Sequence, residues 1–276
     1  MSRSFRDLLL HLVASPFPTP GWALESSADL ARKWGARVSC ALVQPVIPSV
    51  SNWVADRLVH ANEAIANANV RNSEACSALL DQVSETISSD VRGDRVTLPG
   101  GPVPNPDALV RLARTHDLSI VPVAPNLDYQ LAAEALIFES ARPVLLLPSA
   151  MKSARKIVVA WDGGRPAARA VGDALPLLGD AENVRLVSIA GEQGKTLQPL
   201  STLQSYLGRH GIRAECEEIC SKAQDVGCFL MEHAAEGGAD LLVMGAYGHS
   251  RTRQFILGGV TRSVMHHPRL PIFLSH

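Results

Sequence analysis

Short apolar runs alternate with longer segments of helical spacing along the whole chain. The runs Asp7–Val13 and Lys156–Asp162 are almost continuously apolar, as in strands that are buried on both faces. Each run is followed by a proline-containing turn and then by apolar residues at helical spacing, over Trp22–Trp34 and Ala167–Leu178. This alternation predicts strands joined by helices, which is the pattern of a mainly parallel sheet.

The same order of segments occurs twice. After the two helices, strands are predicted at Ala36–Gln44 and Asn183–Ala190. Towards the end of each half, two further apolar segments align. The aligned pairs are Asp117–Pro122 with Asp240–Gly245, and Pro143–Leu147 with Pro271–Ser275. The predicted fold class is therefore α/β, with two open, mainly parallel five-stranded sheets flanked by helices.

A short polar link separates the two halves. Pro148–Arg155 lies between a closing strand and an opening strand, which sets the expected domains at residues 1–148 and 156–276. Because the link is short, we expect the two domains to stay in contact as an intramolecular pseudo-dimer.

One region breaks the symmetry. Asn52–Ser89 in the first half has apolar residues at helical spacing, whereas the corresponding Leu197–His210 is far shorter. A continuous helix of that length would reach roughly 50 Å, so we expect a break near Asn67–Asn72. The segment either covers its own sheet or forms an oligomer or partner contact.

Composition places the chain among ordinary globular proteins. It has 276 residues, of which 46% are hydrophobic and 19% charged, and its net charge is −1. This balance gives no reason to expect nucleic acid or a membrane surface as a partner. No apolar run reaches the ~18 residues of a membrane span. The segment Met1–Ser15 is interpreted as a first strand rather than a signal peptide.

The cysteines form no recognisable metal or disulfide pattern. Their number is odd and no CxxC occurs. Cys216 and Cys220 fall in a predicted strand, where four residues span ~13 Å, too far for a shared metal or a disulfide. We therefore expect buried, reduced thiols, no metal site and a cytoplasmic location. The five are Cys40, Cys76, Cys216, Cys220 and Cys228.

A glycine-containing loop follows the strand Ala239–Met244. Gly245 and Gly248 stand three apart, and Gly258 and Gly259 follow nine residues later, where a helix is expected to begin. Glycine lets backbone N–H groups approach an anion closely, and a helix N-terminus favours phosphate. Ligands of open parallel sheets bind beyond the carboxyl ends of the strands, where Asp162 also lies. The loop is therefore a candidate phosphate site. Nearby polar candidates are His249, Arg251, Arg253, Thr261 and Arg262.

This spacing differs from that of other phosphate loops. The chain contains no GxxxxGK[ST] and no GxGxxG after an opening strand, which disfavours a Walker-type NTPase and a dinucleotide fold. Instead, Gly245-x2-Gly248-x9-Gly258, with a strand before it and a proline-led strand after it, resembles the nucleotide loop of the universal stress protein family. Residues 156–276 resemble this family strongly and residues 1–148 weakly, so the chain looks like a tandem member with a Rossmann-like fold.

The resemblance implies an ATP or related adenine-nucleotide site in the second half, possibly with Mg²⁺. Asp162 would meet the ribose or base, and Ile189 would offer its backbone to the adenine. The remaining residues would line the phosphates or adjoin them. These are Met244, Gly245, Gly248, His249, Gly258, Gly259, Val260 and Thr261.

Two departures from the family pattern matter. Gly259 stands where the family has Ser or Thr, so one hydroxyl contact to phosphate is missing. In the first half, Val13 replaces Asp162, while Pro122 and Pro125 replace Gly245 and Gly248. Proline lacks the N–H donor and fixes φ. We therefore expect no nucleotide in the first half, whose role would be that of a permanent partner.

The predicted function is nucleotide binding that alters an interaction in a stress response. No catalytic set is present that would support more than slow ATP hydrolysis. One alternative is a nucleotide-free scaffold acting through dimerisation surfaces, as a homodimer or with a protein partner. Another is an adenylating transferase of a related fold, which is disfavoured because the chain lacks HxGH-type and SGG-type loops.

Overall fold

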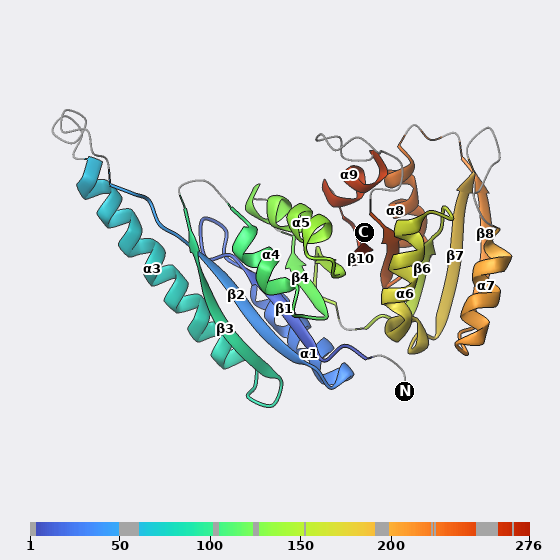
Figure 1. Ribbon diagram of the computed structural model, residues 1–276, viewed down its shortest axis with the longest axis horizontal. Coiled ribbons are helices and arrows are strands. Elements are labelled where there is room, and N and C mark those ends of the chain that lie inside the picture. The colour runs from blue at the N-terminus through green and yellow to red at the C-terminus, as the bar shows by residue number, and fades with distance from the viewer. Residues whose placement is uncertain are drawn as a thin grey trace.

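The structure, a computed structural model, places all strands of the described residues in one sheet of ten strands. The described residues are 4–49, 61–101, 105–123, 127–151, 153–190, 199–221, 223, 225–246, 259–266 and 268–276. The sheet runs along an elongated molecule, with the first half at one end and the second half at the other (Figure 1). Its strand order is β3-β2-β1-β4-β5-β10-β9-β6-β7-β8.

The elements of the first half are β1 Asp7–Leu12, α1 Gly21–Trp34, β2 Arg37–Pro45, α3 Ala61–Thr86, β3 Arg92–Gly100, α4 Asp107–Ala113, β4 Leu118–Pro122, α5 Leu127–Glu139 and β5 Val144–Leu147. Those of the second half are β6 Lys156–Ala160, α6 Arg165–Gly179, β7 Asn183–Ala190, α7 Leu200–Arg209, β8 Glu215–Cys220, α8 Val226–Glu236, β9 Leu241–Gly245, α9 Gly259–His266 and β10 Ile272–Ser275. This arrangement confirms the predicted α/β class.

The two halves repeat one strand arrangement down to its register. Leu10 of β1 pairs with Ile120 of β4, and Val159 of β6 pairs with Val243 of β9 at the corresponding position. An aspartate that bonds the start of the first strand also occurs in each half. One oxygen of Asp117 accepts from the backbone N–H groups at the start of β1, at 2.7 and 3.0 Å, and Asp240 does the same at the start of β6, at 2.9 and 3.0 Å.

The halves meet through their last strands. β5 and β10 pair antiparallel, with Leu145 opposite Phe273, so the two five-stranded sheets form one continuous sheet. Alternate residues of each strand point to opposite faces, where two core clusters lie. One cluster includes residues of α1, α3, α6 and α7, and the other includes residues of α4, α5, α8 and α9.

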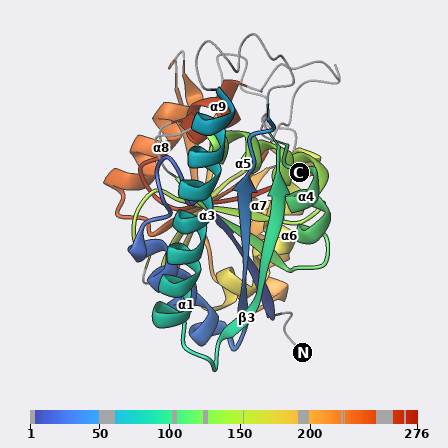
Figure 2. The same ribbon diagram turned by 90° about the vertical axis from the view of Figure 1, so that its left-hand side faces the viewer.

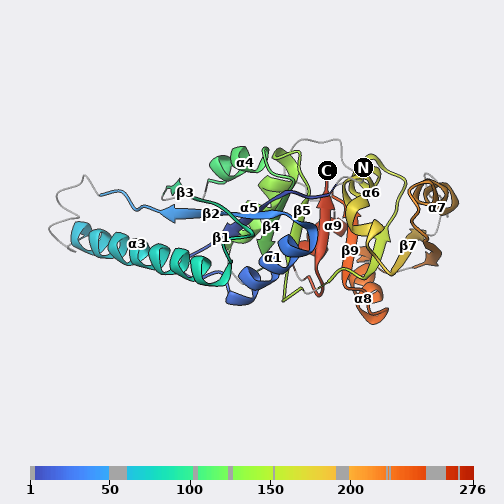
Figure 3. The ribbon, with the colours of Figure 1, turned by 90° about the horizontal axis from the view of Figure 1, so that it is seen from below.

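Helix α3 lies at the end of the molecule formed by β2 and β3 (Figures 2 and 3). It is continuous from Ala61 to Thr86, so the expected break near Asn67–Asn72 is wrong. The reason is that the asparagines bond outside their own helix. Asn69 accepts from the N–H of Ile47 and donates to its carbonyl, both at 2.9 Å. The part of the expected segment over residues 52–60 lies outside the described residues.

The cysteine prediction is only partly confirmed. All five thiols are free, and Cys40 and Cys76 are buried as expected, but Cys216, Cys220 and Cys228 are exposed. Two of the exposed thiols lie on β8, which is an edge strand of the sheet and is therefore covered less completely than a central strand. The expectation of five buried thiols was wrong for these three.

Candidate functional site at the carboxyl ends of β6, β7 and β9

The predicted residues of the second half gather where the connections of the sheet diverge. From β6 the chain passes through α6 to β7 on one side, and β9 lies on the other side of β6. Asp162 follows β6, Gly245 ends β9 and Ile189 lies near the end of β7. Because these strands are adjacent and parallel, the three residues lie along one edge of the sheet, at its topological switch point.

Asp162 shapes the turn that leads into α6. Its carboxylate accepts from the backbone N–H of Gly164 at 2.7 Å, while Gly163 between them has a φ of 76°. A side chain at Gly164 would lie 2.9 Å from the Asp162 carboxylate, which explains why glycine is found there. The same interaction brings negative charge to the N-terminus of α6, where the helix dipole stabilises it.

Gly245 allows α6 to pack directly on the end of β9. A Cβ atom at Gly245 would lie 2.3 Å from the backbone nitrogen of Ala167 and 2.4 Å from the carbonyl carbon of Pro166. Neither backbone atom can move away without shifting the first turn of α6. Glycine is thus required by close approach of the helix, independently of any ligand.

Ile189 lies beyond the last ladder pair between β6 and β7. That ladder ends at Ala160 and Val187, whose carbonyl also accepts from Trp161 N–H at 2.8 Å. The ladder between β7 and β8 continues to Ala190. Since alternate residues direct their backbone groups to the same side of a strand, Ile189 directs its backbone towards the β6 side, like Val187. This is the side on which Asp162 lies.

Helix α9 begins at Gly259 and is held by α8. Ser263 Oγ donates to Asp225 at 2.6 Å, and a side chain at Gly227 would lie 2.6 Å from the Val260 carbonyl. The hydrogen bond from Ser263 is the main reason that the pKa of Asp225 lies below its ordinary value. Sequence reasoning missed this contact, although Asp225 three residues before Cys228 is a recognisable helix-cap signal, and it accepts from the N–H of Cys228 at 2.9 Å.

The three described residues at the start of α9 differ in exposure. Gly259 is exposed, Val260 is half-buried and Thr261 is only 3% exposed. A Cβ atom at Gly259 would meet no atom of the described residues within 4 Å. Met244, which precedes Gly245, has its side chain in the core. The predicted residues Gly248, His249 and Gly258 lie outside the described residues, as do Arg251 and Arg253.

A family model identifies the half of the chain that carries this site. Residues 153–276 match the universal stress protein family. The second half of the chain belongs to the universal stress protein family. A universal stress protein of Synechocystis sp. is 25% identical over 142 residues, which make up 50% of this chain and 48% of that relative. The chain thus spans about half the length of this relative.

Solved structures resemble the whole chain in fold. A universal stress protein from Archaeoglobus fulgidus superposes with a TM-score of 0.70 at 15% identity, covering 97% of each chain. A Pseudomonas aeruginosa structure named for the same family gives a TM-score of 0.60 at 15% identity, covering 98% of this chain and 93% of that one. These likenesses extend the fold of the universal stress proteins over both halves.

The first half differs from the universal stress protein half at the matching edge. The register places Pro122 of β4 where β9 has Gly245, and Val13 follows β1 where Asp162 follows β6. Pro122 is buried and pairs with Leu147 of β5. This edge therefore has neither the carboxylate nor the glycine of the second half.

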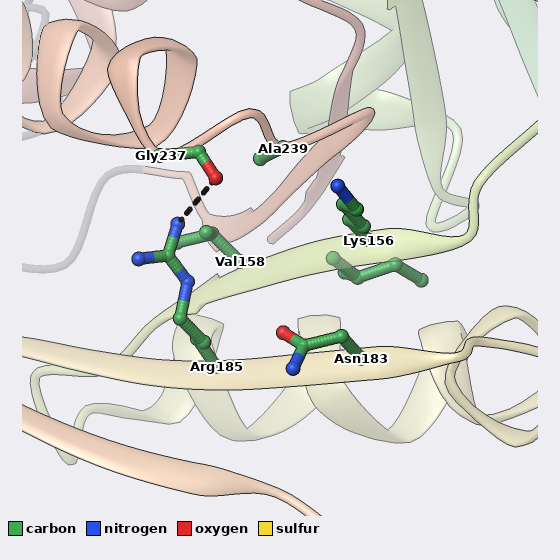
Figure 4. A pocket seen from close by; sticks show the side chains of 7 residues that line it. Lys156, Val158, Asn183, Arg185, Gly237 and Ala239 are labelled. Atoms are coloured by element: carbon green, nitrogen blue, oxygen red, sulfur yellow. Dashed lines mark hydrogen bonds between the residues drawn. The ribbon is translucent and has the colours of Figure 1, made fainter.

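A small cavity lies at the other edge of the second half (Figure 4). It lies at the amino ends of β6 and β7, where Arg185 donates to the Gly237 carbonyl at 3.3 Å. Its volume of about 20 Å³ has room for about one water molecule, so it is not a nucleotide site. Within the described ranges, no cluster of three metal-ligating side chains occurs and no helix is long and apolar enough to span a membrane.

Proposed function

We propose that the second half binds an adenine nucleotide, ATP in the first instance, and that binding regulates an interaction in a stress response. The observation that carries the proposal is the convergence of Asp162, Ile189 and Gly245 at the switch point of a universal stress protein fold. The spacing Gly245-x2-Gly248-x9-Gly258 supports phosphate as the group bound beyond β9.

The edge offers groups suited to each part of such a ligand. The Asp162 carboxylate can accept from ribose hydroxyls, and the Ile189 backbone, beyond the end of the β6 ladder, can bond an adenine edge. The exposed start of α9 at Gly259 supplies backbone N–H donors and the positive end of a helix dipole for phosphate. The burial of Thr261 makes these backbone donors more important than its hydroxyl.

A nucleotide-free scaffold is the alternative that the exposed surface favours. Val46, Ile47 and Val70 are exposed on β2's extension and α3, at the end of the molecule away from the second half. An apolar surface of this kind can serve a protein partner. Partner binding through this surface does not require Asp162, Ile189 or Gly245. Only the nucleotide-binding function therefore predicts that ATP stabilises the protein.

A thermal-shift experiment separates them. The melting temperature of the full chain is measured with and without millimolar ATP and Mg²⁺, and a ligand that binds the folded state raises it by mass action. We expect a rise in the wild-type protein and none in Gly248→Pro. Arg37→Lys, a conservative exchange on an exposed position of β2, serves as the control and keeps the rise.

The outcomes are distinct. No shift in the wild-type protein, together with no nucleotide released from it on denaturation, contradicts nucleotide binding and leaves the scaffold function. A shift that persists in Gly248→Pro places the site elsewhere on the chain.

A further inference from the structure

Helices α5 and α9 are counterparts, because each leads to the last strand of its half. Counted back from Pro143, Leu131 occupies the position that Gly259 occupies before Pro271, 12 residues away in both cases. Residues 127–130 form the first described turn of α5, and the matching residues 255–258 lie outside the described residues.

The turn formed by residues 127–130 of α5 reaches across to α9. The hydroxyl of Tyr129 donates to the backbone carbonyl of Met265 at 3.4 Å, and Gln130 Nε2 lies 3.4 Å from Nδ1 of His266. Tyr129 is only 4% exposed, so its ring is packed in the core beneath this contact. Both contacts join the first half to the last turn of α9.

The next turn of α5 also faces α9. Burial raises the pKa of Glu134, and the positive charges of His266 and Arg262 offset part of that rise. Glu134 is thus close enough to His266 and Arg262 of α9 for their charges to act on it, although burial has the larger effect on its pKa.

Helix α9 needs such outside support because it is short. Eight residues form only two turns, and a helix of this length is not stable by itself in water. Its own half holds it through α8, by Ser263 with Asp225 and by the close approach of Gly227 to Val260. The first half holds it at its opposite end, through Met265 and His266.

We propose that Tyr129 and Gln130 are positioning residues for the nucleotide site of the other half. They hold the last turn of α9, and since a two-turn helix moves as a unit, they fix the N–H groups at Gly259 that face the ligand. Both residues belong to the half that has Pro122 and Pro125 in place of the loop glycines. This inference rests on the proposed function for its ligand, but not for the ordering of α9.

The test compares two double variants of the full chain. Tyr129→Phe with Gln130→Ala removes the polar atoms that reach α9. Tyr206→Phe with Gln204→Ala makes the same exchanges on α7, where Gln204 donates to the Ala214 carbonyl at 2.7 Å and Tyr206 packs on the His210 ring. Hydrogen exchange of the α9 amides is measured without ligand by mass spectrometry, and the dissociation constant for MgATP is measured by calorimetry.

We expect α9 amides to exchange about fivefold faster in the first variant only, with an about fivefold weaker affinity for MgATP, as for the loss of about one net hydrogen bond. Unchanged α9 exchange, or equal acceleration over the whole chain, overturns the inference. Faster α9 exchange with unchanged affinity overturns it too. If the wild-type protein binds no MgATP, the proposed function fails, while the exchange result still decides whether the first half orders α9.

Discussion

The ends of β4 and β9 occupy the same position in the two halves but end in different residues, proline and glycine. At the end of β9, Gly245 admits the first turn of α6 to direct backbone contact. At the end of β4, Pro122 fills that position and pairs with Leu147 of β5. The comparison teaches that one strand order can carry different residues at matching strand ends. The last residue of the strand sets how closely a helix backbone can approach it.

The largest effect is expected where the glycine is sterically required. Gly245→Ala would place a methyl group on the backbone of Pro166 and Ala167, so α6 must shift. We expect a loss of about 3 kcal/mol in the free energy of unfolding, measured by urea denaturation. Gly259→Ala is the matched control, because its methyl group meets no atom within 4 Å in the part of the chain that the structure describes. Equal stability of the two variants would contradict the packing role of Gly245.

The two halves also differ within their first strands, β1 and β6. His11 of β1 stands where β6 has Ala160; it is buried, and neither ring nitrogen has a hydrogen-bond partner among the described atoms. Burial lowers the pKa of His11 from 6.5 to about 4, and the backbone of Ala41 counteracts only part of this. The neutral ring is therefore the form that the fold accommodates.

His11 makes the folded protein less stable as the solution becomes acidic. Below pH 6.5 the unfolded chain binds a proton at His11 that the folded chain does not bind until about pH 4. The free energy of unfolding therefore falls as the pH falls through this window, by about 2 kcal/mol between pH 7.5 and pH 5. His11→Leu should remove this part of the loss. Parallel urea titrations of both proteins at pH 7.5 and pH 5 test it, and an identical loss in both would count against it.

A smaller effect is expected at the start of α9. Gly259→Ser adds a hydroxyl at an exposed position, where no described atom lies within 4 Å of an added Cβ. If phosphate binds there, one new hydrogen bond should tighten MgATP binding about fivefold. Gly259→Ala separates the hydroxyl from any effect of the side chain on the helix. Equal affinities of the serine and alanine variants, measured by calorimetry, would place the phosphates away from Gly259.

The sequence was informative about strands and their alignment, because apolar runs and turn residues are local signals. It aligned Pro122 with Gly245, and the strand registers agree. It could not show that β5 pairs with β10, since two strand edges far apart in the chain carry no local sign of their pairing. It also misjudged α3, because the partners of Asn69 lie on another segment. The role of Gly245 beside Pro166 needed atomic distances, which spacing does not supply.

The smallest effect is expected from restoring the first half. Val13→Asp with Pro122→Gly returns the carboxylate and the glycine to the ends of β1 and β4. These exchanges leave α5 in place, with Leu131 at the position that corresponds to Gly259 of α9. We therefore expect the stoichiometry of MgATP to remain one per chain, measured by calorimetry. A second equivalent would mean that the strand ends alone decide binding. An unchanged stoichiometry would mean that residues beyond the strand ends, such as Leu131, also exclude the nucleotide.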